Sequence, residues 1–164
     1  MHAVLHSFSY CLDYFREQVT DVAPADMTAQ PNGFLMHPAW VLGHLTYSCQ
    51  ALGVEIGLSP WLPAVWAANF GTGSVPFPDP KAYVDKAEGL AMLTDAQRRI
   101  STAVEQLTAS QLDAPLPDER FRFVLPTIRH AITQVLIAHT ANHVGQVTLW
   151  RRAMDLPTIK RPFV

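Results

Sequence analysis

The chain has 164 residues, of which 49% are apolar and 16% are charged, and its formal net charge is −2. This length and composition predict one globular domain over residues 1–164 and exclude an intrinsically disordered chain. Cationic side chains occur at most in pairs such as Arg98-Arg99, which leaves no electrostatic footprint for nucleic acid, and no apolar run reaches the roughly 18 residues of a membrane-spanning helix.

The cysteine content and the N-terminus bear on the compartment. Cys11 and Cys49 are the two cysteines of the chain, which is too few for a disulfide framework. The first residues do not show the charged and apolar pattern of a signal peptide. We therefore expect a cytoplasmic protein with reduced thiols and no membrane partner.

Two helices are predicted in the first third of the chain. Apolar residues recur at steps of three and four from Leu5 to Val19, which is typical of a helix with one buried face over about residues 3–20. After a break that contains proline and glycine, Pro38 fits the first turn of a second helix that extends to about residue 57. Because this second helix is apolar on nearly all sides, we expect it to be the most buried one.

A long aromatic connection follows the second helix. Residues 58–80 contain five prolines, and a loop of such length inside a compact domain is usually functional or disordered. Its aromatic residues argue against disorder, and they either form the wall of a pocket or simply cover the end of the helices. These aromatic residues are Trp61, Trp66, Phe70 and Phe77.

Two further helices are predicted in the second half. Asp79 and Pro80 suit the N-cap and first turn of a third helix that runs to about residue 108. Pro126 opens a fourth helix that runs to about residue 154. Four long helices without a strand predict an all-α four-helix bundle with one long crossover connection between the second and third helices.

Histidines on the second and fourth helices form a candidate metal site. His139 and His143 are four residues apart, so they lie about 40° apart on one helical face, with Cβ atoms about 5–6 Å from each other. His44 lies in the middle of the apolar second helix, where an isolated imidazole needs a polar partner. If the two helices face each other, the three imidazoles can meet on one cation. The alternative is that they are core histidines satisfied by hydrogen bonds.

Several neighbours of these histidines are candidates for lining a pocket or for supporting the ligands. Three of them lie within one turn of His44, and the fourth follows His143 by three residues. All four can equally be core residues. They are Trp40, Tyr47, Ser48 and Gln146. Gly43 is a poor helix former, by about 1 kcal/mol relative to alanine, and predicts that a neighbouring backbone approaches closely at this position.

The remaining histidines are predicted not to join the site. His130 precedes His139 by nine residues, which places it on the opposite face of the fourth helix. His37 is about 10.5 Å from His44 along the helix axis and precedes a proline, so we expect it outside the helix. His2 and His6 are predicted to be exposed.

Three histidines with an open coordination position suit zinc, nickel or another late first-row divalent ion. Such an ion acts as a Lewis acid and lowers the pKa of a bound water or thiol. Residue 140 is a threonine, which excludes the H-E-x-x-H motif, and Glu55 is about 16 Å from His44 along the helix. Without a general base, a small thiol is favoured over water, because a thiolate needs little further help once it is ionised.

Two segments together resemble the DinB-like superfamily, which includes YfiT-type metal-dependent proteins. They are "WVLGHL" at residues 40–45 and "HTANHVGQ" at residues 139–146, the latter followed by "LWRR" and "DLP". The resemblance covers essentially the whole chain and implies an up-down-down-up bundle that forms a homodimer. It also implies that His44, His139 and His143 bind nickel or zinc.

The resemblance implies two kinds of function. Some members of the superfamily are transferases that use low-molecular-weight thiols such as bacillithiol or mycothiol, or glutathione-type isomerases. We therefore expect a metal-dependent S-transferase or hydrolase that acts on a small electrophilic substrate. The alternative is a non-catalytic dimeric bundle that binds a metal or a small molecule in a stress response. The link of the family's name to DNA damage concerns induction and implies no nucleic-acid partner.

Overall fold

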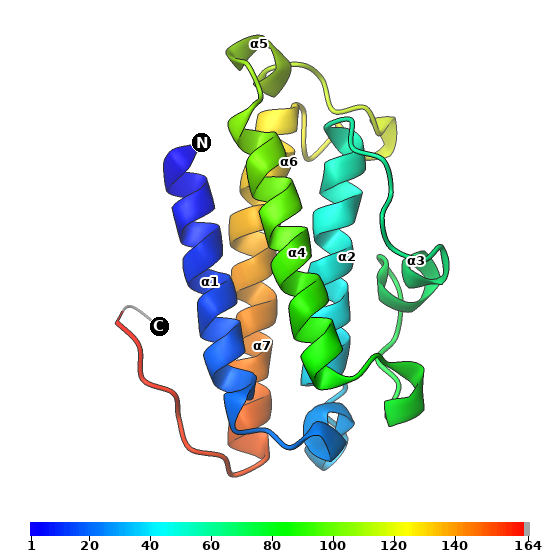
Figure 1. Cartoon of the computed structure of the whole chain (residues 1–164), viewed down its shortest axis with the longest axis vertical. Helices are drawn as coiled ribbons and strands as arrows, with labels where there is room; N and C mark the ends of the chain where they lie inside the picture. Colours follow the sequence, from blue (N-terminus) through cyan, green and yellow to red (C-terminus); the bar gives the residue numbers. More distant parts are fainter. Residues whose placement is uncertain (163–164) are drawn as a thin grey trace.

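The computed structural model describes residues 1–162, and Figure 1 shows four long helical segments lying side by side. The first three are α1 (His2–Thr20), α2 (Pro38–Glu55) and α4 (Lys86–Glu105). The last is continuous through α6 (Ile128–Thr133), a π-helical turn (Gln134–His139) and α7 (Thr140–Ala153). Within residues 1–162 the only β pairing is an isolated bridge between Pro115 and Thr127, which confirms the all-α expectation.

The four segments run in two directions (Figure 1). α1 and the last segment point one way, and α2 and α4 point the other way. α2 contacts both α4 and α7, and α1 contacts α7 and α4, so each segment has two neighbours. α2 therefore presents one face to the last segment, where two of the histidines lie, and another face to α4.

Short elements connect the long helices. Between α1 and α2 the chain forms two 3-10 turns, at Pro24–Thr28 and Pro31–Gly33. The connection from α2 to α4 runs along the length of the molecule and contains α3 (Val65–Phe70) and a 3-10 turn at Pro80–Ala82. The connection from α4 to α6 contains α5 (Ala109–Leu112) and a 3-10 turn at Glu119–Phe121.

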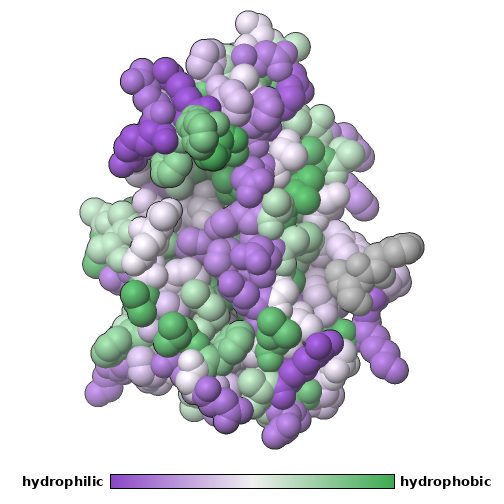
Figure 2. Space-filling view, turned by 180° about the vertical axis from the view of Figure 1, so that it is seen from behind, coloured by the Kyte–Doolittle hydropathy of each residue, from purple (hydrophilic) through white to green (hydrophobic). Residues whose placement is uncertain are grey.

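Burial follows the apolar pattern of the sequence. The apolar residues of α1 that recur at steps of three and four, from Leu5 to Val19, are buried. In α2, buried residues occupy nearly the whole length from Pro38 to Gly53, as expected for a helix that is apolar on nearly all sides. Seen from behind, the surface mixes hydrophilic and hydrophobic residues around a hollow, and no single apolar face dominates this side (Figure 2).

The third long helix begins later than predicted. Asp79 does act as an N-cap, since its side chain accepts a hydrogen bond from the Lys81 N–H, but it caps only the short turn at Pro80–Ala82. The backbone then becomes extended at Tyr83, and Asp85 caps α4 by accepting from the Ala87 N–H. The prediction of a helix from Pro80 was wrong because two successive Asp caps stand close together in the sequence.

The fourth helix is not uniform. It begins at Ile128 and widens into the π-helical turn at Gln134–His139 before α7 begins. The Thr140 hydroxyl donates to the carbonyl of Val135, five residues earlier, at 2.9 Å. Single π-helical turns inside α-helices occur frequently at functional sites, and this one ends at a histidine of the candidate site.

Among residues 1–162, no helix combines the length and the apolar character that crossing a membrane requires.

Candidate metal centre

The fold brings His44, His139 and His143 together. His44 comes from the middle of α2, His139 ends the π-helical turn, and His143 lies one turn into α7. One ligand nitrogen from each imidazole lies within 4.8 Å of the other two. The Nε2 atoms of His44 and His139 are 2.8 Å apart, and the three ring centroids are separated by 4.4, 4.6 and 4.9 Å.

Hydrogen bonds fix the tautomers of two of these imidazoles. Nδ1 of His44 is 2.6 Å from the carbonyl oxygen of Phe70, which can only accept, so this Nδ1 carries the proton. Nδ1 of His143 is 2.8 Å from Oε1 of Gln146, and it donates in the same way. In both rings Nε2 is then the unprotonated nitrogen, so its lone pair is available at the centre of the cluster.

Burial keeps the three imidazoles neutral. His44 and His143 are each only 8% exposed. Desolvation, together with the neighbouring imidazoles, lowers the pKa of His44 to about 4 and that of His139 to about 3, although the hydrogen bond to Phe70 acts in the opposite direction at His44. Burial also lowers the pKa of His143, although its bond to Gln146 acts in the opposite direction. Neutral imidazole is the form that binds a metal ion, so no proton has to leave near pH 7.

Hydrogen bonds within the protein satisfy the cluster only in part, because the Nε2–H of His139 can donate to Nε2 of His44 at 2.8 Å but to no second Nε2. Two unprotonated Nε2 atoms, on His44 and His143, face His139, which carries one N–H proton. Nδ1 of His139 is buried and has no hydrogen-bond partner within the described part of the chain, a shortfall that a cation bound at Nε2 does not remove. A divalent cation accepts all three lone pairs at once, so the donor set fits zinc or nickel better than it fits a set of core histidines.

Four neighbours of the triad were predicted as pocket or support residues, and they lie in different places. The Trp40 ring stacks on His44 with centroids 4.5 Å apart, and Gln146 binds His143. Ser48 instead donates to the backbone carbonyl of His44, four residues earlier, at 2.7 Å. The Tyr47 ring lies beside Gly71. Trp40 and Gln146 thus contact the imidazoles, while Ser48 contacts the helix backbone.

Groups that could act as a base or thiol nucleophile lie elsewhere. A carboxylate oxygen of Glu55 accepts a hydrogen bond from the Asp118 N–H at 2.9 Å, near the end of α2. Cys49 is buried, and desolvation raises the pKa of its thiol to about 12. Neither residue can supply a reactive anion to the triad.

The other histidines do not join the centre. His37 is the N-cap of α2, where its Nδ1 accepts from the Trp40 N–H at 3.2 Å and its Nε2 lies 3.1 Å from the carbonyl of Phe77. A polar side chain directly before Pro38 is the sequence signal for this cap. His130 is exposed and pairs with Thr127 at 2.8 Å.

Phe70 was predicted only as one of the aromatic residues that could form a pocket wall, and its contact with His44 was not foreseen. Its carbonyl binds His44, and its ring packs against Gly43, where a Cβ atom would lie within 2.5 Å of ring carbons of Phe70. The prediction that Gly43 admits a neighbouring backbone was therefore wrong, because the neighbour is an aromatic side chain. The signal for Phe70 was only its place in the aromatic connection.

Comparison with curated proteins and with solved structures finds no match. The family model of the DinB superfamily matches residues 7–147, a span that contains the three histidines of the centre. This span is more than half of the chain. The chain therefore belongs to the DinB superfamily.

Proposed function

We propose that the chain is a divalent-metal-dependent enzyme that acts on a small electrophilic substrate. In this proposal His44, His139 and His143 bind zinc or nickel, and the reacting partner is a low-molecular-weight thiol, as in an S-transferase, or a water. The observation that carries the proposal is the pair of fixed tautomers, since Phe70 and Gln146 make two Nε2 lone pairs available to one point.

The donor set supports an open coordination position. Within residues 1–162 the group of possible ligands consists of the three histidines and includes no cysteine or carboxylate. Three protein ligands on a four-coordinate ion leave one position for an exogenous molecule, which is the pattern of catalytic rather than structural sites. When bound, the ion supplies Lewis-acid chemistry that lowers the pKa of a thiol or a water.

The chain's own residues orient and shield this position. The Phe70 carbonyl and the Gln146 amide hold two imidazoles in the binding tautomer, and the Trp40 ring covers one face of His44. Glu55 is engaged near the end of α2, and among residues 1–162 the group of possible ligands includes no carboxylate that could act as a general base. This favours a thiol over water as the reacting partner.

Superfamily membership supports the remaining parts of the proposal. The directions of the four long helices agree with an up-down-down-up bundle (Figure 1). We propose that the protein works as a homodimer with a small-molecule substrate and without a nucleic-acid partner. Light scattering coupled to gel filtration measures the mass in solution, and a monomer at micromolar concentration would refute the dimer.

Metal content tests the centre directly. We expect the purified protein to hold close to one zinc or nickel ion per chain by elemental analysis, and His44→Ala and His139→Ala to lose it. His130→Ala is the matched control, because it removes an exposed imidazole from the same helical segment. Full metal content in both triad variants would show that the ligands are misassigned.

Thiol consumption tests the reaction. Bacillithiol, mycothiol and glutathione are each offered with a chlorodinitrobenzene electrophile, to the metal-loaded protein and to the same protein after chelation. We expect one thiol to be consumed by the loaded protein and not by the chelated one. If no thiol binds and chelation changes no activity, the enzyme proposal fails and the metal-binding bundle remains as the alternative.

A further inference from the structure

A cavity lies between α2, α3 and the start of α4. It has a volume of about 260 Å³ and is enclosed by the turn at Pro24–Thr28, α2, α3, the turn at Pro80–Ala82 and the start of α4. None of the three histidines lines it. It is therefore a separate site from the metal centre, and nothing in the proposed reaction uses it.

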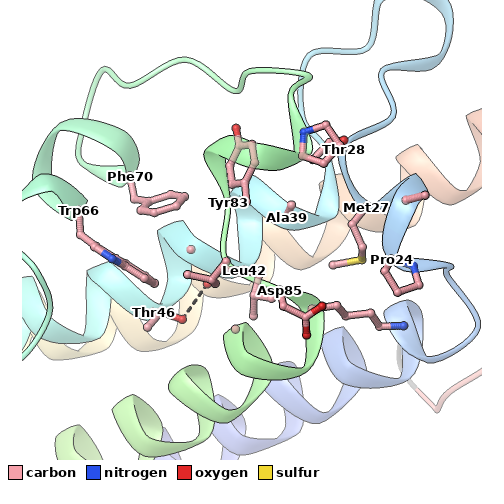
Figure 3. A pocket seen from close by; sticks show the side chains of 16 residues that line it. Pro24, Met27, Thr28, Ala39, Leu42, Thr46, Trp66, Phe70, Tyr83 and Asp85 are labelled. Carbon is pink, nitrogen blue, oxygen red and sulfur yellow. Dashed lines mark hydrogen bonds between the residues drawn. The ribbon is translucent and has the colours of Figure 1, made fainter.

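The wall of this cavity is apolar and rich in aromatic rings. Trp66 and Phe70 stand on one side and Met27 and Pro24 on the other, with Tyr83 between them (Figure 3). Aromatic rings and a methionine sulfur both make favourable contacts with the edges and faces of a bound ring. An apolar cavity of about 150 Å³ accommodates benzene, so this one has room for a larger ring system.

The charged groups at the cavity are already engaged. The Lys86 ammonium donates to the carbonyls of Thr20 and Val22 at 3.3 and 2.7 Å. A carboxylate oxygen of Asp85 accepts from the Ala87 N–H and caps α4. Both charged groups are bound to the backbone of the protein, so neither needs a ligand of opposite charge. A neutral ligand suits such a wall.

Two polar side chains of the wall remain suited to a ligand. Thr28 is buried, and its hydroxyl can donate one hydrogen bond and accept others, while the indole N–H of Trp66 is a donor. We propose that this cavity binds a neutral aromatic molecule, of one substituted ring or two fused rings, that carries one hydrogen-bonding group. None of the residues that line the site is a proposed metal ligand, so its ligand can be tested on metal-free protein.

The test uses indole as the probe and the methyl group of Met27 as the reporter. Met27 is 3% exposed and lines the cavity, whereas Met154 lies after α7. In protein with ¹³C-labelled methionine methyl groups, we expect indole to shift the Met27 signal saturably and to leave the Met154 signal in place. The Met27 signal is assigned with Met27→Leu.

Two matched variants locate the binding. Ala39→Leu places a larger side chain into the cavity, and Ala51→Leu makes the same change on the exposed side of the same helix. We expect Ala39→Leu to weaken indole binding by about tenfold or more and Ala51→Leu to leave it unchanged within about twofold. If Ala39→Leu does not fold, Ala25→Leu, at an exposed position of the cavity wall, takes its place.

Three outcomes would overturn the proposal. One is the absence of any Met27 shift up to the solubility limit of indole. Another is equal affinity in Ala39→Leu and Ala51→Leu, which would place the indole elsewhere. The last is loss of the Met27 shift after chelation, which would place the probe at the metal centre. Failure of the metal proposal, by contrast, leaves the Met27 shift in place.

Discussion

Replacing Gly43 by alanine tests the contact that joins α2 to Phe70. A Cβ atom at this position would lie within 2.5 Å of ring carbons of Phe70, about 1 Å closer than an ordinary carbon–carbon contact. The ring is buried and packs against Trp66 at 4.7 Å and Tyr83 at 6.0 Å between centroids, so these contacts are lost or strained if it moves into the cavity that it lines. The ring, or the helix itself, must therefore shift.

The size of the effect follows from two opposing contributions. Overpacking a core costs about 1–3 kcal/mol, and the severe overlap places Gly43→Ala in the upper part of this range. Alanine in a helix interior recovers about 1 kcal/mol relative to glycine. We expect a net loss of about 1–2 kcal/mol in the free energy of unfolding, which for a chain of this size lowers Tm by about 2–8 °C.

Gly145→Ala is the control with the opposite sign. Gly145 is an exposed residue of α7, and a Cβ atom there would meet nothing within 4 Å. Helix propensity alone then applies, and we expect stabilisation by up to about 1 kcal/mol. Thermal unfolding followed by circular dichroism measures both variants. If both raise Tm, the packing of Phe70 on Gly43 is not as described.

The same variant reports on the metal centre. A displaced Phe70 also displaces the carbonyl that orients His44. Removing such an outer hydrogen bond typically costs 10–100-fold in metal affinity. We expect Gly43→Ala to weaken zinc binding by about tenfold, measured by competition with a chelating dye, and Gly145→Ala to leave it unchanged. Equal zinc affinities in the two variants would show that Phe70 does not support zinc binding by His44.

Three further predictions concern the titratable and polar groups. Gln146→Leu removes the acceptor of His143 Nδ1, and we expect zinc affinity to fall by about 10–100-fold without a change in fold, again by chelator competition. In chelated protein, burial lowers the pKa of His44 to about 4 and that of His139 to about 3, from the ordinary 6.5. Between these pKa values and 6.5, the unfolded chain therefore binds more protons than the folded chain. Stability measured by urea unfolding should therefore fall as pH drops from about 6.5 to 4, and a flat profile would contradict the burial of the imidazoles. Because Cys49 is buried with a pKa of about 12, a thiol reagent should label it only after unfolding, and rapid labelling of Cys49 in native Cys11→Ser protein would refute its burial.

Local sequence patterns predicted the parts of the centre that depend on helix geometry. The spacing of His139 and His143 places two imidazoles on one side of a helix, and the apolar surroundings of His44 indicate a buried partner. Both inferences use only the periodicity of a helix. The structure then brings the three side chains together.

The features of the fold and of the centre that depend on contacts between distant segments could not be predicted from the sequence. The hydrogen bond from His44 to Phe70 joins residues 26 positions apart through a connection with irregular backbone. The π-helical turn before Thr140 could not be recognised in the apolar pattern, because it is a single wider turn inside an otherwise regular helix. The start of α4 was misplaced since Asp79 and Asp85 are equally good caps, and only packing decides between them.

Phe70 belongs to two sites at once. Its carbonyl oxygen binds His44, and its ring lines the aromatic cavity. Binding free energies at two sites are reciprocal, so whatever factor an aromatic guest applies to metal affinity, the metal applies to the guest. A single residue of α3 thereby gives this small domain the means for thermodynamic linkage between an organic ligand and an inorganic one.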